Sequence, residues 1–294
     1  NPGPLANLKV VEMGTLIAGP YCARLLAEFG AEVVKIETPG EGDPLRKWRQ
    51  LHEGNSLWWY VQARNKKSVA VNLKAPEGQQ VVRELASKAD IVVENFRPGT
   101  MEKWGLGYDA LAKAIPGLVM VRLSGFGQTG PYATRPGFDQ VAQGMGGLMS
   151  VTGLPGQGPV RVGIPIADLC GGIFAAYGVT VALLEREASG MGQWLHTSLL
   201  ESMIYMMDFQ TARWSVDHEV PGQAGNYHPT SIPTGVYATK DGHINVAVFG
   251  GKIWERFAEA MGAPEWITDE RSKSKAGRSV NRDFIGALLQ LNAE

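Results

Sequence analysis

Residues 8–37, LKVVEMGTLIAGPYCARLLAEFGAEVVKIE, contain the pattern that decides the fold. Two runs rich in β-branched residues, Leu8–Met13 and Ala31–Glu37, are separated by a helix-like segment, Pro20–Phe29. A strand, a helix and a second strand in one short stretch form a βαβ unit, whose two strands are parallel and whose crossover is right-handed. The stretch therefore predicts an α/β protein built on a parallel sheet.

The same alternation continues to about residue 125. We expect three further strands and two further helices there, at Ser68–Leu73, Asp90–Glu94, Leu118–Leu123, Pro76–Ser87 and Tyr108–Ala114. Repeated βα units favour an open Rossmann-like parallel sheet with helices on both faces. The predicted fold class is α/β, with this sheet in a large domain and a smaller α+β domain after it.

The second half of the chain has a different texture. Glycine and proline interrupt residues 124–172, which indicates loops and tight turns. An apolar helix is expected from Asp168, and the further expected elements are a strand at Gln193–Ser198, a methionine-rich helix at Leu199–Trp214, a hairpin of Thr234–Ala238 with His243–Phe249, and a helix at Ile253–Met261. We predict a large domain over residues 1–215, a linker over 216–232 and a small domain over 233–294.

Composition limits the classes of partner. The 294 residues carry 28 basic and 29 acidic side chains, so no basic surface for nucleic acid or an anionic membrane is expected. The longest apolar stretch, Ile173–Leu184, is shorter than the ~20 residues of a membrane span. The two cysteines and the absence of a visible presequence predict a cytoplasmic protein, or a matrix protein in a eukaryote. The five histidines have no metal-ligand spacing, so no metal site is predicted.

Asp168 is an isolated carboxylate ahead of the apolar helix, in the run GIPIADLCGG. The structural interpretation is a helix N-cap that accepts from the backbone N–H of Cys170 or Gly171, worth ~1 kcal/mol. The functional interpretation is a nucleophile whose charge is held at the helix terminus. Residue patterns alone favour the cap, and the two interpretations are compatible. Asp139 is the other carboxylate that lacks an assigned partner.

Two loops are candidates for anion binding. Gly14 and Gly19 follow the first strand but lack the glycine spacing of a dinucleotide fingerprint, so a tight turn is the better interpretation. The loop Glu94–Gly99 follows the fourth strand, where open α/β sheets bind ligands. Arg97 and Lys103 are candidate phosphate ligands there and Phe96 a candidate for base stacking, although the residues alone favour a surface loop with two solvated cations.

Together these motifs resemble the class III coenzyme A transferases, the CaiB/BaiF-like family of formyl-CoA transferase and carnitine CoA-transferase. The resemblance covers about Leu8 to Gly262. It rests on Ala18-Gly19-Pro20, GAEVVKIE at 30–37, NKKS at 65–68, VENFRPG at 93–99, LSGFG at 123–127, Asp168 with its glycines, and GMGQ at 190–193.

The resemblance implies a mechanism and a set of site residues. Asp168 corresponds to the family's catalytic aspartate, which carries the acyl group as a mixed anhydride and CoA as an aspartyl thioester. The implied CoA contacts are Asn95, Phe96, Arg97, Lys103, Val71, Lys74 and Ile17, although Ile17 replaces a glutamine found in some relatives. The implied lid and substrate residues are Gly250, Gly251, Phe138, Asp139 and Gln140, and Tyr132 and Tyr205 are further candidates for the pocket wall.

The resemblance also implies partners and leaves alternatives. An acyl-CoA and a small carboxylic acid are the expected substrates, with no tightly bound cofactor and an interlocked homodimer as the assembly. Related α-methylacyl-CoA racemases use a histidine at the position of Phe138 as one of two bases, and Phe138 cannot transfer a proton. A CoA-binding protein without turnover is the third possibility. Relatives are longer, so the small domain is expected to be incomplete in this sequence.

Overall fold

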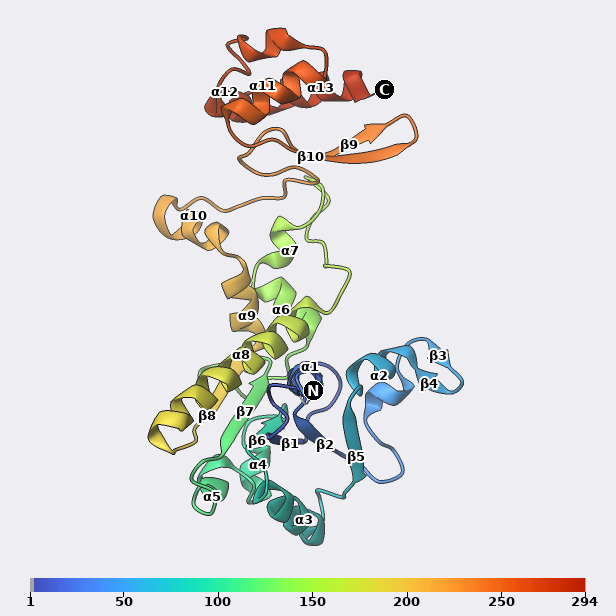
Figure 1. Cartoon of the computed structure of the whole chain (residues 1–294), viewed down its shortest axis with the longest axis vertical. Helices are drawn as coiled ribbons and strands as arrows, with labels where there is room; N and C mark the ends of the chain where they lie inside the picture. Colours follow the sequence, from blue (N-terminus) through green and yellow to red (C-terminus); the bar gives the residue numbers. More distant parts are fainter. Residues whose placement is uncertain (1–2, 294) are drawn as a thin grey trace. The chain divides into compact units, whose positions relative to one another are not determined.

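The computed structural model describes residues 3–293, with side chains described over 3–289, and divides into two compact units. The first unit comprises residues 3–148 and 161–218, and the second comprises 149–160 and 219–293 (Figure 1). The domain and linker boundaries derived from the sequence stay predictions.

A six-stranded parallel sheet forms the centre of the first unit, in the order β5-β2-β1-β6-β7-β8. Its strands are β1 (Lys9–Glu12), β2 (Glu32–Glu37), β5 (Lys66–Ala70), β6 (Ile91–Glu94), β7 (Val119–Ser124) and β8 (Trp194–Ser198). The prediction of a parallel α/β sheet is therefore confirmed. From β1 the chain first adds strands on one side and later on the other, so the order reverses beside β1.

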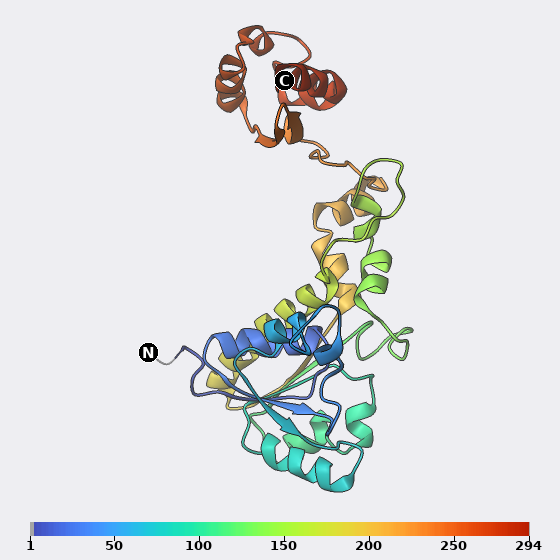
Figure 2. The same cartoon turned by 90° about the vertical axis from the view of Figure 1, so that its right-hand side faces the viewer.

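Both faces of the sheet are buried because successive side chains of a strand point to opposite faces. Val10, Ile91 and Val93 pack with α1 and α8 in one apolar cluster. Val11 and Val92 pack with α3, α4 and α5 in the other. Figure 2 shows the strands between the blue α1 on one side and the teal α3 on the other. These helices are α1 (Ala18–Glu28), α3 (Pro76–Ala86), α4 (Thr100–Lys103), α5 (Tyr108–Ala112) and α8 (Ile166–Ser189).

Helix α8 has 24 residues, twice the apolar stretch read from the sequence, so the length argument against a membrane span was wrong. By length and composition α8 passes the test for a spanning helix, but a core helix of a soluble protein passes the same test. Here α8 packs on α1, β7 and β8. Gly172 allows this packing, since a Cβ there would lie 2.9 Å from the carbonyl oxygen of Ala18.

The rest of the first unit comprises η1 (Pro44–Lys47), β3 (Leu51–His52), β4 (Asn55–Ser56), α2 (Leu57–Gln62), α6 (Asp139–Met145), α9 (Leu199–Met206) and α10 (Phe209–Asp217). The single helix predicted over Leu199–Trp214 was wrong. It divides at Asp208, whose φ of 46° is incompatible with a continuous helix.

The second unit has its own core. A hairpin of β9 (Thr234–Thr239) and β10 (Gly242–Ala247) confirms the predicted turn at Lys240-Asp241. The helical elements are α7 (Leu148–Val151), which begins at the last residue of the first unit, α11 (Gly251–Ala260), η2 (Pro264–Ile267), α12 (Lys275–Val280) and α13 (Arg282–Ala293). Trp254 and Trp266 stack with ring centroids 6.1 Å apart and are packed with Tyr237 in this core.

Candidate active site

A cavity of about 620 Å³ lies in the first unit, beyond the carboxyl ends of β1, β6 and β7. The ends of these strands and the segments after them supply Thr15–Ala18, Asn95–Pro98 and Leu123–Gly125 to its wall. The remaining wall comes from 135–140, 161, 165, 168 and 199, together with Trp48, Arg49, Trp58 and Ala133. Open α/β sheets bind ligands at the carboxyl ends of the strands where the strand order reverses. The cavity is at that position, beside β1.

Asn95 fixes the loop between β1 and α1. Its side-chain oxygen accepts from the backbone N–H of Thr15 at 2.8 Å, and its side-chain nitrogen donates to the carbonyl of Thr15 at 2.9 Å. Gly14 makes room for this amide, because a Cβ there would lie 3.3 Å from the Asn95 oxygen. The turn predicted at Gly14 and Gly19 thus depends on a side chain that follows β6, far away in the sequence.

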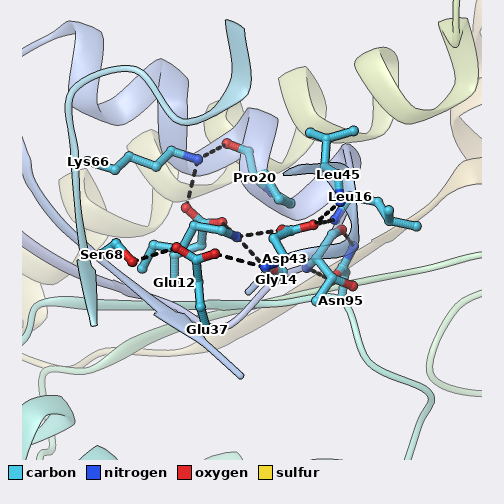
Figure 3. A network of polar contacts seen from close by, with 12 residues as sticks. Glu12, Gly14, Leu16, Pro20, Glu37, Asp43, Leu45, Lys66, Ser68 and Asn95 are labelled. Carbon is cyan, nitrogen blue, oxygen red and sulfur yellow. Dashed lines mark hydrogen bonds and ion pairs between the residues drawn. The ribbon is translucent and has the colours of Figure 1, made fainter. Parts of the chain in front are cut away.

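A buried cluster of charged side chains supports the same loop (Figure 3). Lys35 lies 2.7 Å from Glu12 and 2.9 Å from Asp43, and it also donates to the carbonyl of Gly14. Lys66 lies 2.7 Å from the other Glu12 oxygen and donates to the carbonyl of Pro20. We call Glu12, Lys35, Asp43 and Lys66 the buried ion cluster. Each of its charges has an opposite charge in contact.

Asp43 connects the buried ion cluster to the cavity wall. Its carboxylate accepts from the backbone N–H of Leu16 at 3.1 Å and of Leu45 at 2.8 Å. Leu16 has a φ of 64°, which is costly for a residue with a side chain. The hydrogen bond that the Leu16 N–H donates to Asp43 therefore stabilises a strained loop conformation in the cavity wall.

The loop after β6 is ordered by Glu94. One of its oxygens accepts from the backbone N–H of Phe96 at 2.7 Å, and the other lies 2.8 Å from Arg122 on β7. The Phe96 ring packs edge-on against Trp104 with centroids 5.1 Å apart. Arg97 is exposed and belongs to the cavity wall.

Asp168 lies in the first turn of α8 and in the cavity wall, but it is not the N-cap. The cap position is Pro165, which has no capping side chain, so the sequence-based expectation that Asp168 accepts from Cys170 or Gly171 was wrong. Asp139, at the start of α6, performs that role across the fold. One of its oxygens accepts from the backbone N–H of Ala167 at 2.8 Å and of Asp168 at 3.4 Å.

The Asp168 carboxylate is electrostatically unfavourable in its ionised form. Burial is the larger cause and the nearby negative charge of Asp139 the smaller one, and together they raise the pKa of Asp168 to about 7. Within residues 3–289 no cation or hydrogen-bond donor contacts this carboxylate. A carboxylate with a strongly raised pKa in a cavity wall is a candidate catalytic group.

Asp139 itself is well bound. Gln143, one helical turn later in α6, donates to its second oxygen at 2.6 Å. The guanidinium of Arg161 lies 3.6 Å from the same oxygen, close enough for attraction but too far for a hydrogen bond. Asp139 therefore holds the start of α8 on one side and faces Arg161 on the other.

Four arginines line the cavity, namely Arg49, Arg97, Arg135 and Arg161. Only Arg97 was singled out from the sequence. Two tryptophans also line it, Trp48 and Trp58, and their ring centroids are 6.3 Å apart. A wall with four arginines, several aromatic rings and two carboxylates suits a ligand with anionic groups and flat or apolar parts. The sequence could have indicated part of this wall through the run Arg-Pro-Gly-Phe-Asp-Gln at 135–140.

The structure brings together some of the residues predicted from the sequence. Ile17, Asn95, Phe96, Arg97, Phe138, Asp139, Gln140 and Asp168 all line the cavity. Val71, Lys74, Lys103, Tyr132 and Tyr205 do not. Val71 is buried in the core, whereas Lys74 and Lys103 are exposed. Gly250 and Gly251 lie at the start of α11 in the second unit. In the described part of the chain no cluster of His, Cys, Asp and Glu is arranged to hold a metal.

Comparisons with known proteins agree on one family. CoA-transferase family III matches residues 5–293. The succinyl-CoA–D-citramalate CoA-transferase of Chloroflexus aurantiacus is 44% identical over 290 residues, which cover 98% of this chain and 72% of that protein. The beta subunit of succinyl-CoA–L-malate CoA-transferase from the same organism is 42% identical, with 98% and 74% covered. The crystal structure of a CAIB/BAIF family protein from Brucella suis has a TM-score of 0.87 and 34% identity, covering 100% of this chain and 79% of that one.

Proposed function

Since the chain belongs to CoA-transferase family III, we propose that it moves CoA from a dicarboxylic acyl-CoA to a carboxylic acid, with Asp168 as the covalent carrier. The observation that carries the proposal is the Asp168 carboxylate itself. It is half-buried in the wall of a cation-lined cavity, its pKa is raised to about 7, and among the described residues nothing neutralises it. A carboxylate held in this way is available to form a covalent bond.

The proposed reaction consists of four transfers that balance without water. The Asp168 carboxylate attacks the donor thioester carbonyl, the C–S bond breaks, and CoA leaves as a thiolate. The thiolate attacks the Asp168 acyl carbon of the anhydride and releases the donor acid as its carboxylate. The acceptor carboxylate attacks the aspartyl thioester and again expels the thiolate. The thiolate then attacks the acceptor acyl carbon and regenerates the Asp168 carboxylate.

The fold supports this chemistry by positioning. Asp139 of α6 binds the backbone at Asp168, and Gly172 lets α8 pack closely on α1, so the helix that carries the nucleophile is held by two other helices. Well-oriented groups reach effective molarities of ~10^5 M or more, which compensates for the weak nucleophilicity of a carboxylate. Burial of the carboxylate also keeps water away from the anhydride and the thioester.

The anionic groups of CoA match the cationic wall. Arg97 follows β6 in the loop fixed by Glu94, and Phe96 lies beside it, so this loop is our candidate for CoA contact. Asn95 acts on the protein backbone at Thr15, and we propose that it contributes to CoA binding by holding that loop. Val71 and Lys74 remain candidates for the adenosine end of CoA, Lys103 for its phosphates, and Gly250 and Gly251 for a lid.

Dicarboxylic substrates are the best supported class. The relatives in the comparison are named for succinyl-CoA with citramalate or malate, and succinate, citramalate and malate are all dicarboxylic acids. Four arginines give this cavity more positive charge than a purely apolar acyl chain requires. Phe138, which is 61% exposed, and Ile17 supply the apolar surface for the carbon chain.

We also propose a homodimer, interlocked as the family resemblance implies. Helix α8 has an outward stripe of apolar residues, Ile173, Tyr177, Val181 and Leu184, and Tyr177 and Leu184 are 69% and 68% exposed. Burying each such side chain stabilises an assembly by about 1.5–3 kcal/mol. The molar mass from light scattering tests this proposal, and a monomer at micromolar concentration contradicts it.

The direct test of the mechanism is to trap the intermediate. The protein is incubated with succinyl-CoA, treated with hydroxylamine or borohydride, digested and analysed by mass spectrometry. We expect the peptide that contains Asp168 to become a hydroxamate or a reduced alcohol. An unmodified peptide during turnover, together with solvent deuterium at the α-carbon of a branched acyl-CoA, would favour racemase chemistry. No histidine lines the cavity as described, which disfavours that outcome.

A further inference from the structure

We infer that Arg161 binds the second carboxylate of a dicarboxylic acyl group while Asp168 reacts with the first carbonyl. The inference rests on the proposed function and assigns its substrate specificity to one side chain. Arg161 lies in the cavity wall, seven positions before Asp168 in the chain, and was not singled out from the sequence.

The guanidinium of Arg161 has unused hydrogen-bonding capacity. It carries five N–H donors, and its nearest carboxylate oxygen, Oδ2 of Asp139, is 3.6 Å away. That oxygen already accepts from Gln143 at 2.6 Å, and the other Asp139 oxygen accepts from two backbone N–H groups. Within residues 3–289 Arg161 donates no hydrogen bond to another residue, and 37% of its side chain is exposed. The arginine is therefore held electrostatically and has donors free for a ligand.

The position of Arg161 relative to the nucleophile is set by Asp139. One oxygen of Asp139 binds the backbone at Asp168, and the other faces Arg161, so a single buried carboxylate separates the two groups. Arg161 and Asp168 line the same cavity, so the second carboxylate of a short dicarboxylic acyl group would lie in the part of the wall that carries Arg161. A guanidinium binds a carboxylate with two parallel N–H···O bonds, which also fixes the orientation of the chain.

The other three arginines of the wall differ in their surroundings. Arg135 lies 4.1 Å above the ring of Tyr132, and Arg49 lies 5.9 Å from the ring of Trp58. Arg97 belongs to the loop after β6. None of these three contacts the residue that binds the backbone at Asp168. They suit the phosphates of CoA, which every acyl-CoA donor shares.

The test compares succinyl-CoA with butyryl-CoA, which has a methyl group where succinyl-CoA has the second carboxylate. The first half-reaction is measured as release of succinate or butyrate in single-turnover experiments by mass spectrometry. For Arg161→Gln we expect the rate constant at subsaturating succinyl-CoA to fall ~10- to 100-fold, since a charge-assisted hydrogen-bonded pair is lost. The rate with butyryl-CoA should change less than ~3-fold, because the methyl group makes no ionic contact.

Arg135→Gln is the matched control, since it removes another arginine of the same wall. We expect it to affect both donors equally, through the shared CoA moiety. Arg161→Lys retains a positive charge, so it should restore part of the succinyl-CoA rate, and circular dichroism checks that each variant is folded. Equal losses with both donors in Arg161→Gln, or a wild-type protein that does not prefer succinyl-CoA to butyryl-CoA, would overturn the inference. Failure of the proposed function has a different signature, because the wild type would then release neither acid and form no adduct on Asp168.

Discussion

The buried ion cluster and the cavity wall at Asp168 both contain buried carboxylates, but they treat the charges in opposite ways. In the cluster, Glu12 and Asp43 lie 2.7–2.9 Å from Lys35 and Lys66. At Asp168 the charge that shifts the pKa is that of another carboxylate, Asp139. In the buried ion cluster every charge lies next to an opposite charge. The ionised carboxylate of Asp168 has no such partner among the described residues.

The buried ion cluster and the cavity wall at Asp168 therefore have different roles. The paired charges of the buried ion cluster hold the loop between β1 and α1, including the strained backbone at Leu16. This loop is therefore a rigid part of the cavity wall. An unpaired carboxylate has its pKa raised by burial and keeps its lone pairs free for a reaction. Removing a charge should therefore abolish chemistry in the wall and lower stability in the cluster.

The largest expected effect comes from Asp168→Ala, which removes the unpaired charge. Transfer between succinyl-CoA and an acceptor acid should fall by more than about 10^4-fold, as for other covalent carriers. CoA binding should be nearly unchanged, because the lost group forms a covalent bond and is not a binding contact. Isothermal titration with CoA and a transfer assay by mass spectrometry separate the two. Retained turnover would show that another group carries the acyl chain.

The next effect comes from Lys35→Met, which breaks the buried ion cluster. Asp43 would lose its charged partner while it stays buried, and removing one partner of such a pair costs about 3–5 kcal/mol of folding stability. Lys67→Ala is the matched control, since its pair with Glu32 is exposed and worth about 0–1 kcal/mol. Urea denaturation measures both. Similar losses in the two variants would mean that the cluster contributes no more than a surface pair.

Sequence reasoning succeeded where local patterns decide the outcome. Strands such as Ile91–Glu94 are short runs bounded by turn signals, and their burial on both faces makes them nearly continuous in apolar residues. The fold follows from the βα alternation. Asp168, which the family resemblance singled out, lies in the cavity wall, and its catalytic role stays a prediction. Cavity-lining residues near these strand ends, such as Phe96 and Arg97, were identified for the same reason.

The failures concern contacts between segments far apart in the chain. The cap of α8 comes from Asp139, 28 positions before Ala167, so no local rule could replace Asp168 as the expected cap. The amide of Asn95 acts on Thr15, 80 positions away, and its role in holding the first loop was not predicted. Arg161 was missed because a single arginine in a glycine-rich loop has no pattern around it.

The third prediction concerns folding stability and pH. The pKa of Asp168 in the folded protein, about 7, lies above its ordinary value of 3.8, so the folded state binds this proton more tightly than the unfolded chain does. The wild type therefore loses stability as the pH rises from about 4 to about 7, at up to 1.36 kcal/mol per unit. Asp168→Asn lacks this group and should be more stable than the wild type at pH 8, by about 4 kcal/mol at most, but not at pH 4. Thermal or urea unfolding at the two pH values measures it, and an equal difference at both would contradict the raised pKa.

The smallest expected effect is a shift of the pH–rate profile in Asp139→Asn. The side-chain oxygen of asparagine can still accept from the N–H groups of Ala167 and Asp168, but its negative charge is gone, so the pKa of Asp168 should fall. Because burial is the larger cause of the raised pKa, the acid limb of kcat/KM should move to lower pH by only part of the distance from about 7 to 3.8. Asp139→Ala is the contrast, since it leaves two buried N–H groups without an acceptor, and it should lower kcat strongly. An unshifted acid limb in a folded Asp139→Asn protein would mean that burial alone sets the pKa, and that Asp139 acts on Asp168 only through the backbone.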